Sequence, residues 1–419
     1  KYDNEWSPDS KYLLYSDRTL HLKLFNVESN SEIIVSRATD TEIRDYSFSP
    51  DSKWVVYSKE SPNGQSSVWV YNIPEQQNHQ LTGDTFSDYS PVFSADGDFI
   101  FFLSNRDFNL NFSSFEFDYV YDNATRIYAM TLKSDGPPLY KDKNDQEPVQ
   151  EEEENKEEEE NAEEKQPEKD KNGSVQVEID VEGIQDRIEA LPPKAGSYRN
   201  LGAVEDGLLY ISGGKLHKYV ISKEETTEIM EGVSQVLVSA DKKSMLYRYG
   251  GDYGIASIAP GKKPGDGKLD LSDLEMKIDP VKEWKQIYND GWRIFRDYFY
   301  VENLHEVDWK AMKEKYGRLV PYVGHRADLD YILSELVSES NTGHAYVNWG
   351  DFEKVKPIES GLLGARLEAD QTAGRFRIDE IYKGENWNQE RRSPLTELGV
   401  DVHEGDYLLS INGQEIAAS

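Results

Sequence analysis

Residues 341–346, Asn-Thr-Gly-His-Ala-Tyr, contain a side chain suited to proton transfer, the imidazole of His344. The pKa of imidazole lies close to neutrality, so a histidine can take up a proton and return it at physiological pH. Such a group acts as a general base only if the backbone holds it rigidly and leaves it open to a cleft. The elements on either side of His344 therefore decide whether it does chemistry.

A helix is predicted over residues 328–340, directly before His344. Residues 341–343 end its periodicity with residue types that helix C-termini favour, and residues 345–347 return to an extended pattern. The apolar face of this helix consists of Tyr331, Ile332, Leu336 and Val337. We expect His344 at a junction between helix and strand. The alternative is that its ring only caps the helix or packs against it.

Other polar residues near this stretch are given structural roles. Ser340 lies one helical turn before His344 and is expected to form hydrogen bonds at the helix end. His305 and His325 have no second ligand at helical spacing, so we interpret both as ordinary polar residues and expect no metal site. The chain has no Cys, which excludes disulfides, thiolate catalysis and Cys-based zinc sites.

Two more helices are predicted before this one. The first begins at Asp279-Pro280 and runs to about Phe299, with apolar residues on an i, i+3, i+4 pattern. A loop over residues 303–309 leads into the second helix, which ends near Tyr316. A small helical domain, residues 278–352, therefore carries His344.

The N-terminal part repeats a unit in which an aromatic residue, a Ser-x-Asp turn and a β-branched or aromatic run follow one another. Copies occupy residues 6–16, 48–58 and 93–102, and weaker copies follow over 205–211 and 239–247. The Asp positions of the first three copies are 42 (51 − 9) and 45 (96 − 51) residues apart, a period typical of propeller blades. The sequence predicts an all-β propeller with WD40-like (PD40) blades over residues 1–262.

Residues 141–173 interrupt the repeats with 15 acidic and 6 basic residues and almost no apolar side chains. Such a segment cannot bury enough surface to offset the entropy of ordering it, so we predict a disordered loop on a blade. A calcium site is the weaker alternative, because the Gly-punctuated ligand spacing of such loops is missing.

The C-terminal part, residues 357–419, returns to strands and resembles a PDZ module that stops before its last helix and strand. Strands are expected over 361–367 and 375–382, a short helix over 393–400, and a hairpin over 405–416 that turns at Asn412-Gly413. In PDZ modules a Gly-rich loop presents backbone N–H groups to a peptide carboxylate. Gly361, Leu362, Leu363 and Gly364 match that loop, although a plain strand turn would have the same composition.

Composition limits the partners and the location of the chain. The formal net charge is −32 over 419 residues, which repels nucleic acid and anionic membranes. No run of 18 apolar residues is present, so we expect no membrane span. The sequence starts with Lys1-Tyr2-Asp3, without an initiator Met and without a basic, apolar leader, so we expect the chain to begin inside a domain.

The order of propeller, small helical domain and PDZ-like module resembles the tricorn protease family, which comprises serine peptidases related to the tail-specific (carboxyl-terminal processing) proteases. The motifs that carry the resemblance are residues 283–300, 303–309, 326–329 and 341–346. The resemblance implies that His344 is the general base of a serine endopeptidase that acts on oligopeptides or unfolded peptides. In archaeal members a Ser precedes this His as an additional catalytic residue, and Gly343 stands in its place here.

The resemblance also implies what lies outside this chain. The nucleophilic Ser, a Glu partner and the oxyanion hole belong to a further domain after the PDZ module, so the fragment is expected to be inactive alone. Membership implies a homo-hexamer, a cytoplasmic location, peptide substrates channelled by the propeller and no cofactor. A periplasmic or exported location remains open.

Two alternatives from other classes remain. A propeller followed by a PDZ-like module can act as a non-catalytic peptide-binding scaffold, which predicts no catalytic Ser beyond residue 419. A periplasmic propeller partner of transport systems fits the Ser-Pro-Asp blades, but it does not account for the helical and PDZ-like parts.

Overall fold

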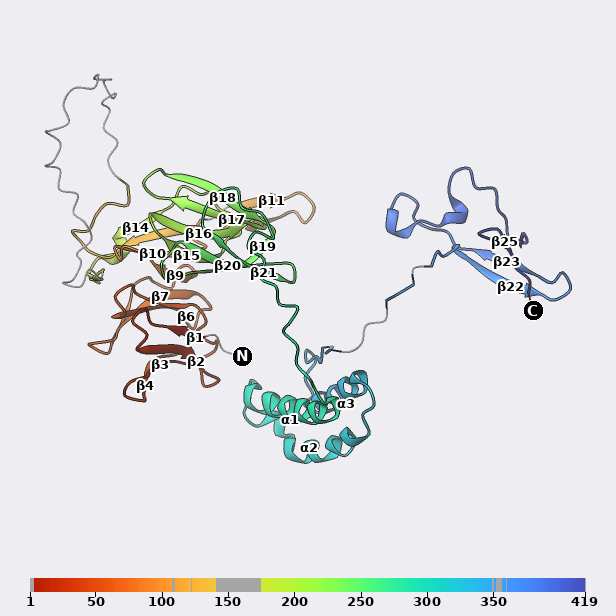
Figure 1. Ribbon diagram of the computed structural model, residues 1–419, viewed down its shortest axis with the longest axis horizontal. Helices are drawn as coiled ribbons and strands as arrows, with labels where there is room; N and C mark the ends of the chain where they lie inside the picture. Colours follow the sequence, from red (N-terminus) through yellow and green to blue (C-terminus); the bar gives the residue numbers. More distant parts are fainter. Residues whose placement is uncertain are drawn as a thin grey trace, which may run out of the picture. The chain divides into compact units, whose positions relative to one another are not determined.

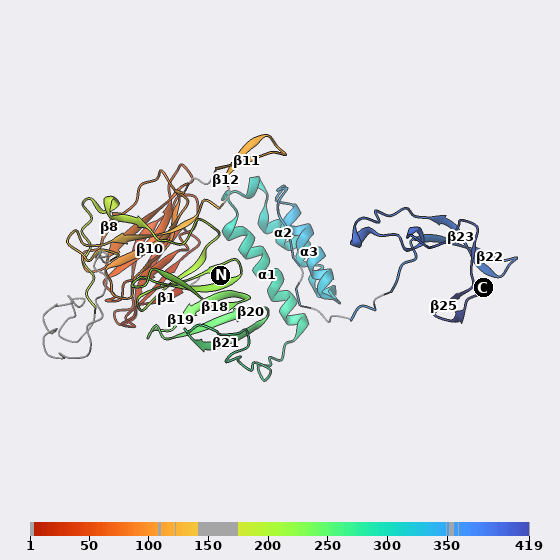
Figure 2. The same ribbon diagram turned by 90° about the horizontal axis from the view of Figure 1, so that it is seen from above.

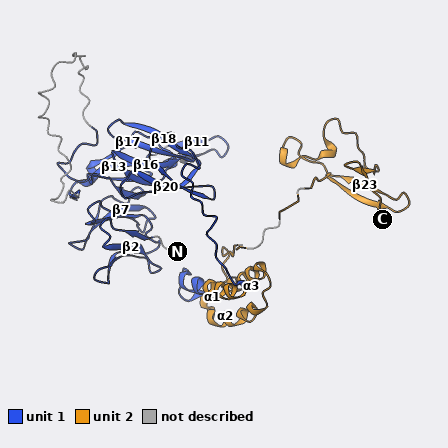
Figure 3. Cartoon of the chain, viewed as in Figure 1, with its two compact units in different colours: residues 1–280, 293–304 blue, residues 281–292, 305–419 orange. Residues whose placement is uncertain are grey.

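The computed structural model describes residues 4–107, 110–121, 123–140, 175–348, 350–351, 356–358 and 360–418. The chain forms two compact units, residues 1–280 with 293–304 and residues 281–292 with 305–419 (Figure 3). The acidic loop predicted over residues 141–173 lies outside the described residues.

Among its described residues, the first unit contains five antiparallel sheets of three or four strands, and in each sheet the strands lie side by side in the order in which they occur along the chain (Figures 1 and 2). The first two sheets comprise β1 (Asn4–Trp6), β2 (Tyr12–Ser16), β3 (His21–Asn26) and β4 (Ser31–Arg37), and β5 (Tyr46–Phe48), β6 (Trp54–Glu60), β7 (Ser66–Asn72) and β8 (Gln77–Gln80). The third comprises β9 (Asp88–Phe93), β10 (Phe99–Ser104), β13 (Arg126–Thr131) and β14 (Ile188–Ala190). The fourth and fifth comprise β15 (Arg199–Val204), β16 (Gly207–Ser212), β17 (Lys215–Val220) and β18 (Glu225–Glu231), and β19 (Val233–Val238), β20 (Ser244–Tyr249) and β21 (Asp252–Ser257).

The repeated Ser-x-Asp turn joins the first and second strands of four of these sheets. In the second sheet, Ser49 Oγ donates to Asp51 Oδ1 at 2.6 Å and accepts the backbone N–H of Trp54 at 2.9 Å. The same two bonds recur at Ser7, Ser94 and Ser239. The sequence repeat therefore marks a hydrogen-bonded turn that starts the second strand of each of these blades.

Replacing Ser49 by alanine is expected to lower the free energy of unfolding by about 1–3 kcal/mol. Ser49 is completely buried, so the N–H of Trp54 and the carboxylate of Asp51 lose a partner that water cannot replace. Ser239→Ala is the matched control, because the same turn there is partly exposed and its loss should cost less. Urea unfolding of both variants checks this, and equal losses would contradict it.

Hydrophobic cores lie between neighbouring sheets, because successive residues of a strand point to opposite faces. On β6, Val55 and Tyr57 pack towards the first sheet, whereas Trp54 and Val56 pack towards the third. On β10, Phe101 likewise faces the fourth sheet. Four such cores join the five sheets among the described residues. The outermost sheets expose apolar side chains instead, namely Trp6, Ile34, Leu237 and Ile255.

The first strands of all five sheets line one cavity of about 460 Å³. Glu5, on β1, accepts the backbone N–H of Phe48 on β5 at 3.4 Å. Burial raises the pKa of Glu5 from 4.5 to about 7, against the opposing effects of that hydrogen bond and of Lys242. Strands arranged around a common centre confirm the predicted all-β propeller.

We expect the stability of this unit to fall by about 1–3 kcal/mol as the pH rises from about 4.5 to about 7. Folded Glu5 binds a proton more tightly than unfolded Glu5, so its contribution is present below pH 4.5 and lost as pH rises through its folded pKa. Asp98, whose pKa is raised by burial and by Asp96 to about 6, acts in the same direction. The difference between wild type and Glu5→Gln in thermal unfolding isolates Glu5, and a difference that does not vary with pH would contradict the expectation.

A few smaller elements accompany these sheets. A hairpin of β11 (Leu110–Ser113) and β12 (Asp118–Tyr121) forms a separate two-stranded sheet, and a 3₁₀ turn spans Ile184–Arg187. The strand suggested by the alternation of Val175–Asp180 is wrong for residues 176–180. The backbone of Val177 instead contacts the turn that leads into β6, where its N–H donates to Asp51 and its carbonyl accepts from Trp54 Nε1.

Three α-helices follow, as the sequence predicts: α1 (Pro280–Tyr298), α2 (Trp309–Gly317) and α3 (Arg326–Ser338). Two indole groups tie α1 to α2, since Trp292 Nε1 donates to the carbonyl of Trp309 at 2.8 Å and Trp309 Nε1 donates to that of Trp292 at 3.0 Å. Asp308 caps α2 by accepting the N–H of Ala311. A left-handed turn over Leu304–Glu306 and a 3₁₀ turn over Val320–Tyr322 flank α2.

The last part contains β22 (Ala365–Asp370), β23 (Arg375–Ile381) and β24 (Tyr407–Leu408) in one sheet, and a hairpin of β25 (Ser410–Ile411) and β26 (Gln414–Glu415). The hairpin turns at Asn412 and Gly413, both with positive φ (51° and 78°), as predicted. The helix predicted over 393–400 is reduced to a 3₁₀ turn, Pro394–Thr396, and a second such turn spans Gln389–Arg391. Leu398 is fully exposed and cannot anchor a longer helix. The fold is thus a β-propeller followed by a small helical domain and a PDZ-like module.

Candidate active site

Helix α3 is anchored by a buried apolar face. Leu329 and Leu336 are completely buried, and Ile332 and Leu333 nearly so. Tyr331 is 68% exposed, so its predicted place on the apolar face is wrong. The buried stripe runs through positions 329, 332, 333 and 336, at i, i+3, i+4 and i+7, and holds the helix that leads to His344.

The helix ends six residues before His344. Its last helical residue is Ser338, and Asn341 then takes a left-handed conformation with φ 54°, common where helices stop. Ser340 is completely buried, and its hydroxyl donates to the carbonyl of Val337 at 2.7 Å. The interpretation of Ser340 as a helix-terminal hydrogen bonder is confirmed.

His344 itself is exposed, and its ring meets the ring of Tyr346 edge-on with centroids 6.4 Å apart. Residues 345–348 form no strand, so the predicted junction between helix and strand is wrong at this point. A strand exists only where a neighbouring strand takes up its hydrogen bonds, and the described residues provide none here. His344 therefore lies on a connecting segment, open to an approaching group.

The chain after His344 turns back onto α3. Val347 lines a pocket of about 230 Å³ together with Ala327, Asp330, Tyr331 and Ser334 of that helix. Gly350 lies so close to Arg326 that a methyl group in its place would be 2.5 Å from the guanidinium carbon. The guanidinium is in turn held by Asp330 at 3.0 Å. These contacts hold the far end of the segment that carries His344.

The two other histidines of the helical domain, His305 and His325, have defined local contacts. His325 caps α3, since its Nδ1 accepts the N–H of Ala327 at 3.1 Å while Asp328 accepts the N–H of His325 at 2.9 Å. His305 Nδ1 lies 2.8 Å from the carbonyl oxygen of Ser340. Among the described residues, no group of three or more His, Asp or Glu side chains is placed to hold a metal ion.

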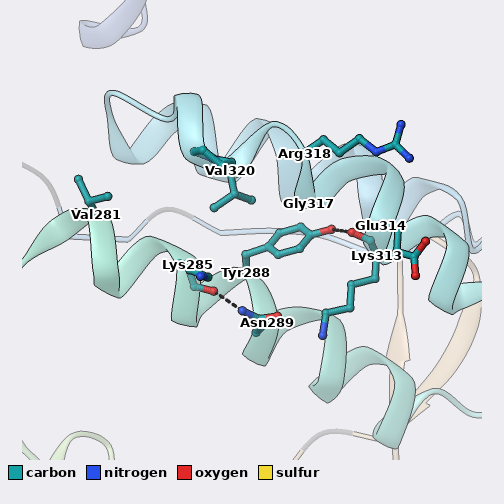
Figure 4. Close-up of a pocket in the computed structure, with 10 residues that line it drawn as sticks. Val281, Lys285, Tyr288, Asn289, Lys313, Glu314, Gly317, Arg318 and Val320 are labelled. Atoms are coloured by element: carbon teal, nitrogen blue, oxygen red, sulfur yellow. Dashed lines mark hydrogen bonds between the residues drawn. The ribbon is translucent and has the colours of Figure 1, made fainter.

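A pocket of about 710 Å³ lies between α1, α2 and the Val320–Tyr322 turn (Figure 4). The Tyr288 hydroxyl donates to the carbonyl of Lys313 at 2.6 Å, and burial raises the pKa of this phenol to about 12. Tyr288 therefore keeps its proton at neutral pH. The residues lining this pocket include neither His344 nor a serine or threonine.

The predicted carboxylate loop, Gly361–Gly364, precedes β22 directly. Leu362 is 84% exposed and Leu363 is 37% exposed. Gly364 has φ 71°, and its carbonyl accepts the N–H of Tyr382 at 2.8 Å. Strand β22 pairs only with β23 among the described strands, so its other edge is available for pairing.

No helix among the described residues is long and apolar enough to cross a membrane.

Three family descriptions match the chain in this order. They are the tricorn protease second beta propeller domain over residues 1–259, the tricorn protease C1 domain over 280–338 and the tricorn protease PDZ domain over 361–419. Tricorn protease homolog 1 of Streptomyces coelicolor is 27% identical, with 98% of this chain and 40% of the relative aligned. The tricorn protease homolog of Saccharolobus solfataricus is 23% identical, with 98% and 38% aligned.

Among solved structures, the crystal structure of the tricorn protease matches with a TM-score of 0.78 at 19% identity, over 99% of this chain and 40% of that one. This likeness shows the fold. The chain spans about 40% of the length of these relatives. Because the propeller description alone covers more than half of the sequence, the chain belongs to the tricorn protease family, a family of peptidases.

Proposed function

We propose that this chain is part of a serine endopeptidase for oligopeptides or unfolded peptides, in which His344 is the general base. The observation that carries the proposal is an exposed imidazole on an anchored segment, in a chain whose parts match tricorn protease domains in order. The proposed domains are residues 1–262, 278–352 and 357–419.

The chemistry requires a hydroxyl that His344 can deprotonate. A serine hydroxyl is a poor nucleophile at neutral pH until a neighbouring base accepts its proton. Ser340 is buried and already donates to Val337, so it does not fill this role. We assign the nucleophile, a Glu partner and the oxyanion hole to a domain that follows residue 419 in the full-length protein, so the chain alone should be inactive.

The family resemblance implies that Gly343 stands where archaeal members carry an additional catalytic Ser. A side-chain carbon built at Gly343 would meet no atom within 4 Å, so steric crowding does not explain the glycine. In this proposal, another group orients His344 in place of that serine hydroxyl, or no such hydroxyl is needed.

Peptide binding is proposed at the PDZ-like module. Backbone N–H groups of Gly361–Gly364 would receive a peptide carboxylate, and the peptide would pair with the open edge of β22. We further propose that the propeller channels peptides, that the protein assembles as a homo-hexamer and that it is cytoplasmic. These three points rest on family membership.

A fluorophosphonate probe tests the proposal, because such probes modify serines activated by a base. The full-length protein should be labelled at one serine beyond residue 419, and labelling should be lost in His344→Ala. A protein that binds peptides but is not labelled would instead support the non-catalytic scaffold.

A further inference from the structure

The turn before α2 has an unusual backbone. Leu304, His305 and Glu306 all have positive φ, at 48°, 57° and 66°. Non-glycine residues rarely take this conformation, and they keep it only where surrounding contacts impose it. Three in succession indicate that contacts outside the turn hold it in place.

One such contact joins the turn to the end of α3. His305 Nδ1 lies 2.8 Å from the carbonyl oxygen of Ser340. A carbonyl oxygen can only accept, so Nδ1 carries the proton and donates it. His325 has the opposite arrangement, since its Nδ1 accepts a backbone N–H. The contact at Ser340 therefore requires a proton on Nδ1 of His305.

The Ser340 carbonyl is well placed to control the segment that follows. Ser340 is completely buried, so water does not readily replace a lost hydrogen bond there. The Thr342 hydroxyl donates to the same carbonyl at 3.3 Å, and Asn341 makes the left-handed turn between them. His344 follows only four residues after Ser340.

The segment over residues 339–348, here called the His344 segment, contains no helix or strand of its own. Its conformation depends on contacts with neighbouring elements. Val347 and Gly350 lie against α3 at the far end, and the His305–Ser340 bond lies at the near end. The side chain of His305 is exposed, so its role is not to fill a core.

We propose that His305 is a positioning residue whose Nδ1–H···O=C bond to Ser340 holds the His344 segment in place. The catalytic consequence rests on the proposed function, because a base must be oriented towards its nucleophile. The anchoring itself depends only on the hydrogen bond.

Two variants of nearly identical shape separate the hydrogen bond from the backbone strain. Asn and Asp both tolerate positive φ, but the side-chain amide introduced by His305→Asn can donate to the Ser340 carbonyl, whereas the carboxylate introduced by His305→Asp only accepts. In the full-length protein, amide hydrogen exchange over residues 340–348 should be about 10-fold faster in His305→Asp than in His305→Asn. Equal exchange in the two variants would overturn the proposal.

Peptide cleavage gives the second measurement. His305→Asp should lower kcat about 100-fold while KM changes little, because orientation of the base is lost and substrate contacts are kept. His305→Asn should restore most of kcat. If the wild type is active and kcat is equal in His305→Asp and His305→Asn, His305 has no role in orienting the base. If the wild type is not labelled by the fluorophosphonate, the proposed function fails, whereas the exchange measurement still decides the anchoring.

Discussion

Replacing His344 by alanine in the full-length protein is expected to lower kcat for peptide cleavage by about 10⁴–10⁶-fold. Without the imidazole, no group removes the proton of the serine hydroxyl as it attacks. Thermal stability should hardly change, because the side chain is exposed and its recorded ring contact is with Tyr346. Steady-state kinetics and a melting curve on the same preparation check both parts.

His403→Ala is the matched control for this variant. Its side chain is 76% exposed and lies 3.7 Å from Asp401 on the PDZ-like module, away from the Gly361–Gly364 loop in sequence. Cleavage should continue in this variant. Turnover retained by His344→Ala would assign the base to another residue, and a large loss of stability in His344→Ala would show that the ring supports the fold.

Replacing Gly207 by alanine is expected to reduce the free energy of unfolding of the propeller by about 4 kcal/mol or more. Gly207 begins β16 with φ 144°, and an added methyl carbon would lie 1.9 Å from the carbonyl oxygen of Tyr219 on β17. The backbone of a paired strand cannot move away without breaking the ladder between β16 and β17. Denaturant unfolding measures the loss.

Gly213→Ala provides the comparison. Gly213 also has positive φ, at 58°, but a methyl group there would meet no atom within 4 Å. The substitution should therefore cost only the conformational penalty, about 1–2 kcal/mol. Similar losses in the two variants would mean that the close approach of Tyr219 is relieved by a small local shift.

Regular features of the fold could be predicted because their causes are local in sequence. The Ser49–Asp51 turn is specified within six residues, and the run of apolar and β-branched residues in β6 encodes a strand buried on both faces. The three helices follow from periodicity and their caps. The hairpin at Asn412-Gly413 follows from residue types that accept positive φ.

The remaining features depend on partners distant in sequence. Extended residues 345–348 form a strand only if another strand is adjacent, and the residues themselves do not encode that neighbour. Val177 binds to Asp51 and Trp54, which lie 126 and 123 positions away, so alternation alone misidentified its segment.

For the candidate site, the sequence identified His344 but not the groups that hold it. The bond between His305 and Ser340 joins residues 35 positions apart, and the contact of Gly350 with Arg326 is also non-local. His305 has no second metal ligand at helical spacing, and nothing in the sequence around it indicated that it would hold the segment that carries His344. The residue types of the 303–309 loop predicted a loop there, but they did not predict that His305 would bond to Ser340.

The exposed Trp6, Ile34, Leu237 and Ile255 have a consequence for how the propeller loses structure. Among the described residues, each inner blade shares a hydrophobic core with two neighbouring blades and each outermost blade with one, so packing is weakest in the two outermost blades. On gradual heating, the outermost blades should loosen while the central ones persist. The outermost blades should then open locally below the midpoint at which the unit as a whole unfolds.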